Sequence, residues 1–157
     1  MTIIRQATID DSIRITPLWI NSMEFHSDHH IIFKTAVGFK EKITDDIKHL
    51  INNPEVKLFV AEQDNEIAGF SLTTISTRPI VFEKRKRGYI GDSYVVEKLR
   101  GQGIGTLLIS TIKKWFKEQK VDFIDLQVTK TNDRGTKFWE KSGFKLVNYY
   151  MVHDLTK

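Results

Sequence analysis

The stretch SYVVEKLRGQGIGTLLIS, residues 93–110, contains the pattern around which we expect the rest of the chain to fold. It reads as a short apolar strand, a turn with glycine at alternate positions (Gly101, Gly103 and Gly105), and the first turns of an amphipathic helix. Glycine allows positive φ angles and lets a ligand come close to the backbone. A helix that begins there directs unpaired N–H groups and the positive end of its dipole at the turn. This combination predicts a phosphate-binding site.

The composition of the whole chain narrows the class of protein. Its 157 residues suffice for one domain that buries roughly two-thirds of the surface of its unfolded chain. The lack of cysteine excludes disulfides, zinc-thiolate sites and cysteine nucleophiles. No apolar run has the length of a membrane span and the first residues lack an apolar signal core, so we expect a cytoplasmic protein with no membrane partner. The formal net charge of +4 suits an anionic ligand but does not by itself indicate nucleic acid.

Hydrophobic periodicity predicts the order of the elements. Strands are expected at residues 3–7, 56–62, 66–76, 88–96, 123–129 and 144–153. Helices are expected from the cap residues 10–12 to about residue 26, over 38–52, after the glycine turn, and over 132–142. The order β-α-α-β-β-β-α-β-α-β predicts an α/β (α+β) fold, with a mixed sheet and helices on both of its faces. We see no internal repeat and expect a single domain over residues 1–157.

Three interpretations of the glycine turn compete on the residues alone. A P-loop requires a lysine after its last glycine, and here Gly105 is followed by Thr106 and Leu107, which excludes it. A dinucleotide fingerprint counted from Gly101 and Gly103 places its third glycine at Thr106, which argues against that fold. The third interpretation is that the glycines only form a tight strand-to-helix turn and bind no ligand.

Two segments resemble one known family. The motif Arg100-x-x-Gly103-x-Gly105, which follows a strand and opens a helix, is similar to the acetyl-CoA motif of the GNAT N-acetyltransferases. The segment NDRGTKFWEKSGF, residues 132–144, is similar to the family's Asn-x-x-Ala-x-x-x-Tyr-Glu-Lys-x-Gly-Phe segment. The resemblance covers nearly the whole chain and is strong over residues 88–144. It implies a mostly antiparallel central sheet of six to seven strands and an N-acetyltransferase that uses acetyl-CoA.

The resemblance implies a set of residues that bind coenzyme A. The N–H groups from Gly101 to Thr106 would hold its pyrophosphate. Backbone groups freed by a bulge in the preceding strand would pair with the pantetheine arm. Asn132 has two open roles, hydrogen bonding to pantetheine or capping the next helix. The full set is Val95, Val96, Arg100, Gly101, Gln102, Gly103, Ile104, Gly105, Thr106, Asn132 and Trp139.

The resemblance also implies how the proton chemistry is arranged. Asp92, on the strand that leads into the turn, is the candidate base for the amine, and the alternatives are attraction of a cationic amine or a structural hydrogen bond. Trp139 stands where the family has a tyrosine that protonates the leaving thiolate. An indole N–H cannot release a proton near neutral pH. Another hydroxyl, such as that of Tyr94, Tyr149 or Tyr150, or solvent would then supply the proton; we favour solvent.

The residues expected near the acceptor lie in the first helix and the following loop. They are Trp19, His26, His29, His30 and Phe33, and we favour a solvated loop over a metal site for the histidines. The basic run at residues 84–87 is interpreted as a solvated hairpin end or a guide for phosphate.

The function predicted from these features is acetyl-CoA-dependent N-acetylation of a small-molecule or peptide amine by direct attack. No metal and no nucleic-acid partner are expected. The alternatives are transfer of a different acyl group and a catalytically silent acyl-CoA-binding module. An exposed final strand would permit pairing of two copies in a homodimer.

Overall fold

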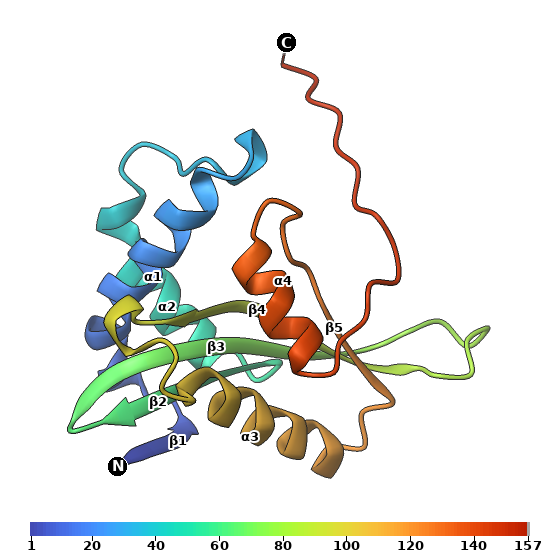
Figure 1. Cartoon of the computed structure of the whole chain (residues 1–157), viewed down its shortest axis with the longest axis horizontal. Helices are drawn as coiled ribbons and strands as arrows, with labels where there is room; N and C mark the ends of the chain where they lie inside the picture. The colour runs from blue at the N-terminus through green and yellow to red at the C-terminus, as the bar shows by residue number, and fades with distance from the viewer. Residues whose placement is uncertain (157) are drawn as a thin grey trace.

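The computed structural model describes residues 1–156 (Figure 1). In chain order its main elements are β1 (Thr2–Gln6), α1 (Ser12–Ser27), α2 (Phe39–Asn52), β2 (Val56–Gln63), β3 (Glu66–Thr77), β4 (Lys86–Val95), α3 (Ile104–Glu118), β5 (Phe123–Leu126) and α4 (Asp133–Lys141). Within these residues, none of the helices is both long and apolar enough to span a membrane.

The strands form one mixed sheet in the order β1-β2-β3-β4-β5. Neighbouring strands are antiparallel except for β4 and β5, which are parallel. The prediction of a mixed, mostly antiparallel sheet is therefore confirmed. The predicted number of strands is wrong, because the described residues form five strands and residues 144–153 are not in the sheet. That segment leaves α4 and runs away from the sheet, so its backbone has no strand to pair with (Figure 1).

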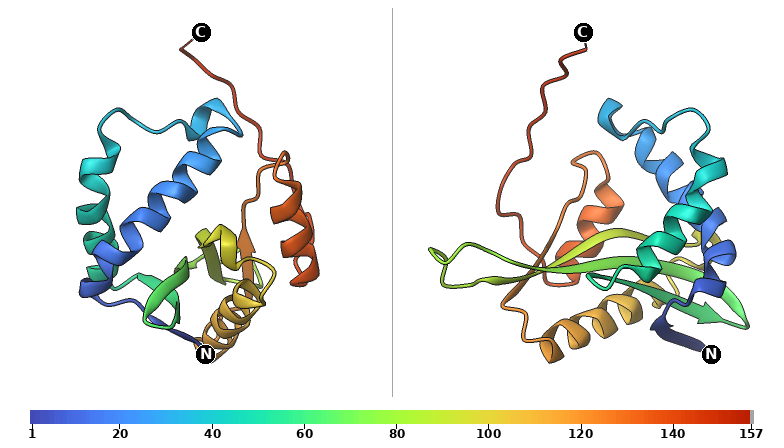
Figure 2. Two further views of the ribbon diagram at one scale, coloured as in Figure 1. Left: turned by 60° about the vertical axis from the view of Figure 1, so that its left-hand side comes forward. Right: turned by 180° about the vertical axis from the view of Figure 1, so that it is seen from behind.

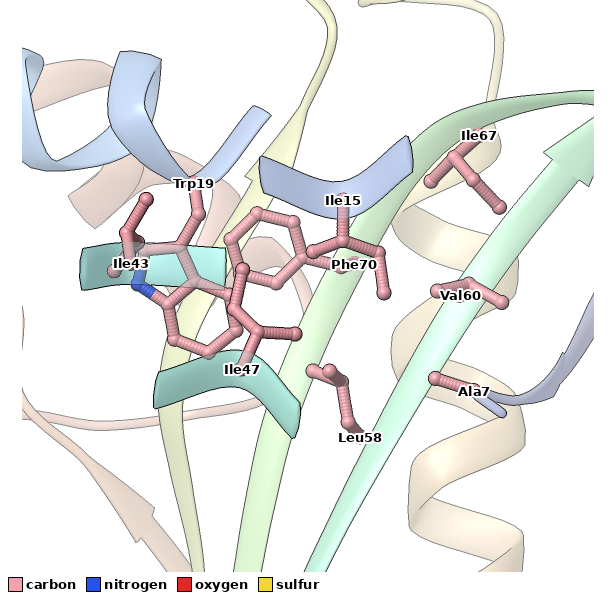
Figure 3. Packing of buried hydrophobic residues seen from close by; sticks show 9 residues of the cluster. All are labelled: Ala7, Ile15, Trp19, Ile43, Ile47, Leu58, Val60, Ile67 and Phe70. Atoms are coloured by element: carbon pink, nitrogen blue, oxygen red, sulfur yellow. The ribbon is translucent and has the colours of Figure 1, made fainter. Parts of the chain in front are cut away.

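Helices cover both faces of the sheet, as predicted, with α1 and α2 on one face and α3 on the other (Figure 2). Figure 3 shows the core beneath α1 and α2, where Trp19 stacks on Phe70 with their ring centroids 4.6 Å apart. The other buried residues of this cluster are Ala7, Ile15, Ile43, Ile47, Leu58, Val60 and Ile67. Trp19 is 4% exposed and thus belongs to the core that fixes α1 on the sheet.

The opposite face is closed by α3, which packs close to β4. A Cβ on Gly88 would lie 2.7 Å from the ring of Phe116, so only glycine lets the helix approach the strand this closely. The buried residues of this cluster are Phe59, Ile90, Leu108, Ile109, Ile112 and Phe116. Side chains of α4 join the same cluster and tie the last helix to α3.

A bulge in β4 decides where the site lies. The register with β3 shifts between the pairs Ser71–Ser93 and Thr73–Ile90, which places two residues of β4, Gly91 and Asp92, opposite one residue of β3. The pairing of β4 with β5 ends at Ile90. Beyond that point β4 continues to Val95 without a partner on its β5 side. The two parallel strands therefore separate at the bulge, and Asp92 lies near the beginning of the free part of β4.

Candidate active site

An open cavity begins where β4 and β5 separate. Its lining residues come from the end of α1, the free part of β4, the glycine turn, the beginning of α3, and the segment from β5 into α4. The cavity thus joins the predicted phosphate turn to the predicted acceptor loop, with Asp92 between them.

The glycine turn has the backbone geometry of an anion site. Gly101 and Gly103 have φ angles of 84° and 83°, and a Cβ at either position would meet no atom within 4 Å. The space beside the turn is therefore open to a ligand. Gly103 caps α3, whose first helical hydrogen bond joins the N–H of Leu107 to the carbonyl of Gly103. The N–H groups of residues 104–106 precede that bond and have no helical acceptor, so they are available to an anion.

The side chains around the turn hold it in place. Ile104 is buried against Ala61 and Ala68, so this helix start is anchored on the sheet while its N–H groups remain at the turn. A Cβ on Gly105 would lie 3.3 Å from the ring of Phe138, which brings α4 close to the beginning of α3. The side chain of Gln102 is exposed.

Val95 and Val96 were both expected to bind coenzyme A through their backbone groups, but only one of their N–H groups is free in the structure. The N–H of Val96 donates to the carbonyl of Ala68 at 2.9 Å, so it is already used within the sheet. In an antiparallel ladder the neighbouring pair, Gly69 and Val95, then has its N–H and carbonyl groups pointing away from each other. The N–H of Val95 therefore points to the open side of β4. Its carbonyl accepts a hydrogen bond from Nε of Arg100 at 2.8 Å.

Arg100 and Asn132 both have structural contacts. The guanidinium of Arg100 lies 5.2 Å from the ring centroid of Tyr94 in addition to its bond to Val95. It thereby fixes the turn to the end of β4. Oδ1 of Asn132 accepts a hydrogen bond from the N–H of Gly135 at 2.9 Å. Of the two roles left open for Asn132, the capping of α4 is the one seen.

Three titratable groups gather around the bulge. Burial raises the pKa of the Asp92 carboxyl above its ordinary value of 3.8, and the charge of His26 only partly opposes this. Burial lowers the pKa of His26 below 6.5, so the imidazole is neutral at pH 7. Burial, together with the charge of Asp92, raises the pKa of Tyr89. A carboxylate with weakened acidity beside a neutral imidazole is suited to accepting a proton.

Tyr89 also lines this site, although its place in the sequence does not predict it. In a regular strand, residues 89 and 92 point to opposite faces of the sheet. The bulge inserts one residue between them, which brings both side chains to the face covered by α1. The family resemblance implied a bulge in this strand but not its position, and Gly91 within the strand pattern is the residue that hints at that position.

The loop after α1 forms an aromatic and histidine cluster at the acceptor end of the cavity. His26 and Phe33 have ring centroids 6.5 Å apart, and His30 lies 6.4 Å from the same phenyl ring. Nδ1 of His29 shares a hydrogen bond of 2.8 Å with Oγ1 of Thr131, which comes from the segment before α4. This bond connects the two sides of the cavity. Among residues 1–156 there is no group of three histidine, aspartate or glutamate side chains placed to hold a metal ion.

Trp139 lies in an aromatic cluster. Its ring is 5.0 Å from that of Phe138 and 5.4 Å from that of Phe144, in edge-to-face arrangements. All three rings also pack against the buried cluster on the α3 face, and this attaches α4 to that face of the sheet. Tyr149 and Tyr150, which were considered as proton donors, are 82% and 70% exposed on the segment that follows α4.

Comparison with known proteins gives a consistent result. Residues 21–144 match the model of the acetyltransferase (GNAT) family. An uncharacterized N-acetyltransferase of Archaeoglobus fulgidus is 28% identical over 136 residues, which cover 87% of this chain and 88% of that protein. A solved structure, the tetramutant of the BH1408 protein from Bacillus halodurans, is 27% identical with a TM-score of 0.87, covering 98% of this chain and 99% of that chain. A second solved structure is a predicted acetyltransferase from Clostridium acetobutylicum with acetyl-CoA. It has a TM-score of 0.75, and the match covers 99% of this chain and 97% of that chain. At 19% identity this likeness shows the fold alone.

Proposed function

The chain belongs to the acetyltransferase (GNAT) family, and on this premise we propose that it transfers the acetyl group of acetyl-CoA to an amine by direct attack. The observation that most supports this reaction is the order of groups along β4. Asp92 lies at the bulge, the N–H of Val95 points to the open side of the strand, and the glycine turn follows directly. The proposed base, oxygen donor and phosphate site would thus follow one another along β4 and into the turn.

The donor half of the proposal is supported by the backbone. The pyrophosphate of acetyl-CoA would lie against the unpaired N–H groups of Ile104, Gly105 and Thr106, in the space that the turn leaves open. The pantetheine arm would then follow the free edge of β4, and the N–H of Val95 would donate to the thioester carbonyl oxygen. Arg100 takes part by fixing the turn to β4 through the Val95 carbonyl.

The acceptor half of the proposal is supported by the charges at the bulge. The amine nitrogen forms a bond to the thioester carbonyl carbon, and its proton passes to the carboxylate of Asp92. The C–S bond breaks, and the coenzyme A thiolate takes a proton from solvent, because Trp139 has no proton to release. His26 is neutral at the working pH and faces the same space, so it can accept a hydrogen bond from the amine. Trp19 is not among the proposed contacts, because its side chain lies in the core.

A catalytically silent module that only binds acyl-CoA is the second candidate. One observation favours it: Trp139, at the position of the expected proton donor, packs between Phe138 and Phe144. A silent module needs the same glycine turn, but it does not need a half-buried carboxylate with a raised pKa beside that cavity. The carboxylate therefore favours catalysis.

Release of the coenzyme A thiol tests the proposed function. The protein is incubated with acetyl-CoA and a panel of polyamines, amino acids, peptides and aminoglycosides, and free thiol is titrated with an aromatic disulfide. Because the chain has no cysteine, all thiol signal comes from coenzyme A. We expect release with at least one amine, and none without an acceptor. Saturable binding of acetyl-CoA without release for any amine would instead identify a silent module, and release only from propionyl- or succinyl-CoA would identify a different acyl donor.

A further inference from the structure

The end of α1 and the loop after it expose apolar side chains to the candidate active site. Phe25, Ile32 and Phe33 are 42%, 41% and 38% exposed, and all three line the cavity. Water beside such a surface is released when a ligand with an apolar body covers it. The same part of the chain also lines the cavity with Met23, Ala36 and Phe39. This end of the cavity is therefore suited to an apolar part of the acceptor.

The aromatic rings of this region form one cluster that reaches Asp92. The ring centroid of Phe25 lies 5.4 Å from that of His26 and 4.7 Å from that of His29. His26 is close enough to Asp92 for the charge of each group to act on the pKa of the other. The proposed base thus has an aromatic surface next to it. This surface, here called the acceptor cluster, consists of Phe25, His26, His29, His30 and Phe33.

One carboxylate serves this part of the cavity wall. Among the described residues of segments 22–39 and 89–95, Asp92 is the single acidic residue that lines the cavity. Lys34 lines the cavity as well and adds a positive charge. Burial lowers the pKa of His26, which keeps its imidazole neutral at pH 7 and compatible with apolar groups. The wall therefore offers a negative charge for one ammonium group, at Asp92.

Two other acidic residues near the acceptor cluster have partners of their own. Glu24 forms an ion pair of 2.5 Å with Nζ of Lys40. Asp154, whose charge interacts with a histidine of the cluster, accepts hydrogen bonds from the N–H and Oγ1 of Thr156 at 2.9 and 2.6 Å. Neither of them, nor Asp28 at the end of α1, lines the cavity. A second ammonium group on the acceptor would therefore give up water at this wall without meeting a second carboxylate there.

We propose, on the basis of the proposed function, that the acceptor is a primary amine with a single positive charge and an aromatic or apolar body. Its amino group lies at Asp92, where the proposed transfer takes place, and its body packs on the acceptor cluster. Polyamines and aminoglycosides, which carry several ammonium groups, are then poor acceptors. Aromatic faces can also attract a cation, so the decisive experiment varies the charge of the acceptor at constant size.

Two matched pairs of amines separate the effect of charge from that of apolar surface. Hexylamine and hexamethylenediamine differ in one terminal ammonium group, and phenethylamine and ethylamine differ in one phenyl ring. We expect kcat/KM to be at least about tenfold higher for hexylamine than for the diamine. It should be about 10- to 100-fold higher for phenethylamine than for ethylamine, the ratio that burial of a phenyl ring supports. Equal or faster acetylation of the diamine would overturn the inference and leave the proposed function intact.

Substitutions of Phe33 connect this preference to the acceptor cluster. Phe33→Ser should bring the ratio of phenethylamine to ethylamine close to one, and Phe33→Asp should raise the ratio of diamine to hexylamine. Phe82→Ser is the matched control, because Phe82 is 41% exposed compared with 38% for Phe33 and does not line the cavity. The control should leave both ratios as they are. If Phe33→Ser does so too, the acceptor cluster does not select the amine.

A binding measurement decides the inference even if no amine is acetylated, an outcome that would contradict the proposed function itself. The ¹⁵N-labelled protein is saturated with coenzyme A and titrated with hexylamine, hexamethylenediamine and phenethylamine. We expect the amides of residues 25–33 and of Asp92 to shift, with a Kd at least about tenfold lower for hexylamine than for the diamine. Tighter binding of the diamine, or no shift in residues 25–33 with any of the three amines, would contradict the inference.

Discussion

Replacement of Asp92 by asparagine is expected to lower kcat by about 10²- to 10⁴-fold, the usual contribution of a general base, while affinity for acetyl-CoA stays nearly unchanged. The amide has the shape of the carboxyl group but cannot accept the proton of the amine. The glycine turn and the N–H of Val95, which are proposed to hold acetyl-CoA, do not involve this side chain. Steady-state kinetics and calorimetric titration of acetyl-CoA measure the two effects separately. A loss of both would mean a structural role for Asp92, and an unchanged kcat would exclude it as the base.

The same substitution is expected to stabilise the fold at neutral pH. The folded pKa of Asp92 is raised, so its ionisation costs the folded state free energy once the pH exceeds the ordinary value of 3.8. Asparagine removes this cost. Thermal unfolding at pH 7 should therefore occur at a higher temperature in the variant. The gain should vanish when the pH falls below 3.8, because the Asp92 carboxyl is then protonated in the folded and in the unfolded state.

Asp125→Asn is a matched control for this experiment. Asp125 lies on the neighbouring strand β5 and forms a 2.8 Å ion pair with Arg87 at a partly exposed position. Such pairs contribute up to about 1 kcal/mol. The control should lose a little stability and keep kcat, which is the reverse of the result expected for Asp92→Asn. A rise in stability in both variants would show that the effect does not come from the buried carboxyl.

The second large effect is expected at the glycine turn, where Gly103→Glu should weaken binding of coenzyme A by about 100-fold, or about 2.7 kcal/mol. The new carboxylate would lie beside the N–H groups that begin α3 and would repel the pyrophosphate from them. The φ angle of 83° adds a backbone penalty of about 1–2 kcal/mol, because side chains other than glycine avoid this region. Calorimetric titration of coenzyme A measures the change in affinity.

Two further variants separate charge from backbone strain. Gly103→Ala has the strain without the charge and should weaken binding far less than Gly103→Glu. Gly143→Ala has the same kind of strain at a φ of 90°, but after α4, and its Cβ would meet only Nζ of Lys113 at 3.8 Å. It should lower the melting temperature and leave the affinity for coenzyme A as it is. Wild-type affinity in Gly103→Glu would show that the ligand does not bind at this turn.

Much of the fold could be predicted because its signals are local. A strand or a helix can be recognised from the pattern of a few neighbouring residues. This holds for the alternation in β2, β3 and β4 and for the glycine turn before α3. The family followed from two motifs at their proper separation and is confirmed. Of the candidate site, the glycine turn, Asp92 and His26 were expected, and the structure places all three on one cavity. A glycine with positive φ is readable from sequence, whereas the hydrogen-bond partner of Val96 depends on the register between β3 and β4.

Two errors of prediction have physical reasons. Trp19 was expected near the acceptor because it lies in the first helix, yet helical periodicity alone does not say which turn of α1 faces the core and which reaches the cavity. Residues 144–153 were expected in the sheet because their pattern is that of a strand. A pattern shows that a segment is suited to pairing, but it does not specify the partner. In the structure this segment is unpaired.

Amide chemical shifts during titration with coenzyme A test the central proposal most directly. In a ¹⁵N-labelled sample, the resonances of Ile104, Gly105 and Thr106 should shift together with that of Val95, and all should saturate at one equivalent. Gly103→Glu should abolish these shifts at the same concentrations. If coenzyme A instead shifts residues of the basic run 84–87, or shifts no amide in residues 95–106, the proposed site on β4 and α3 is wrong.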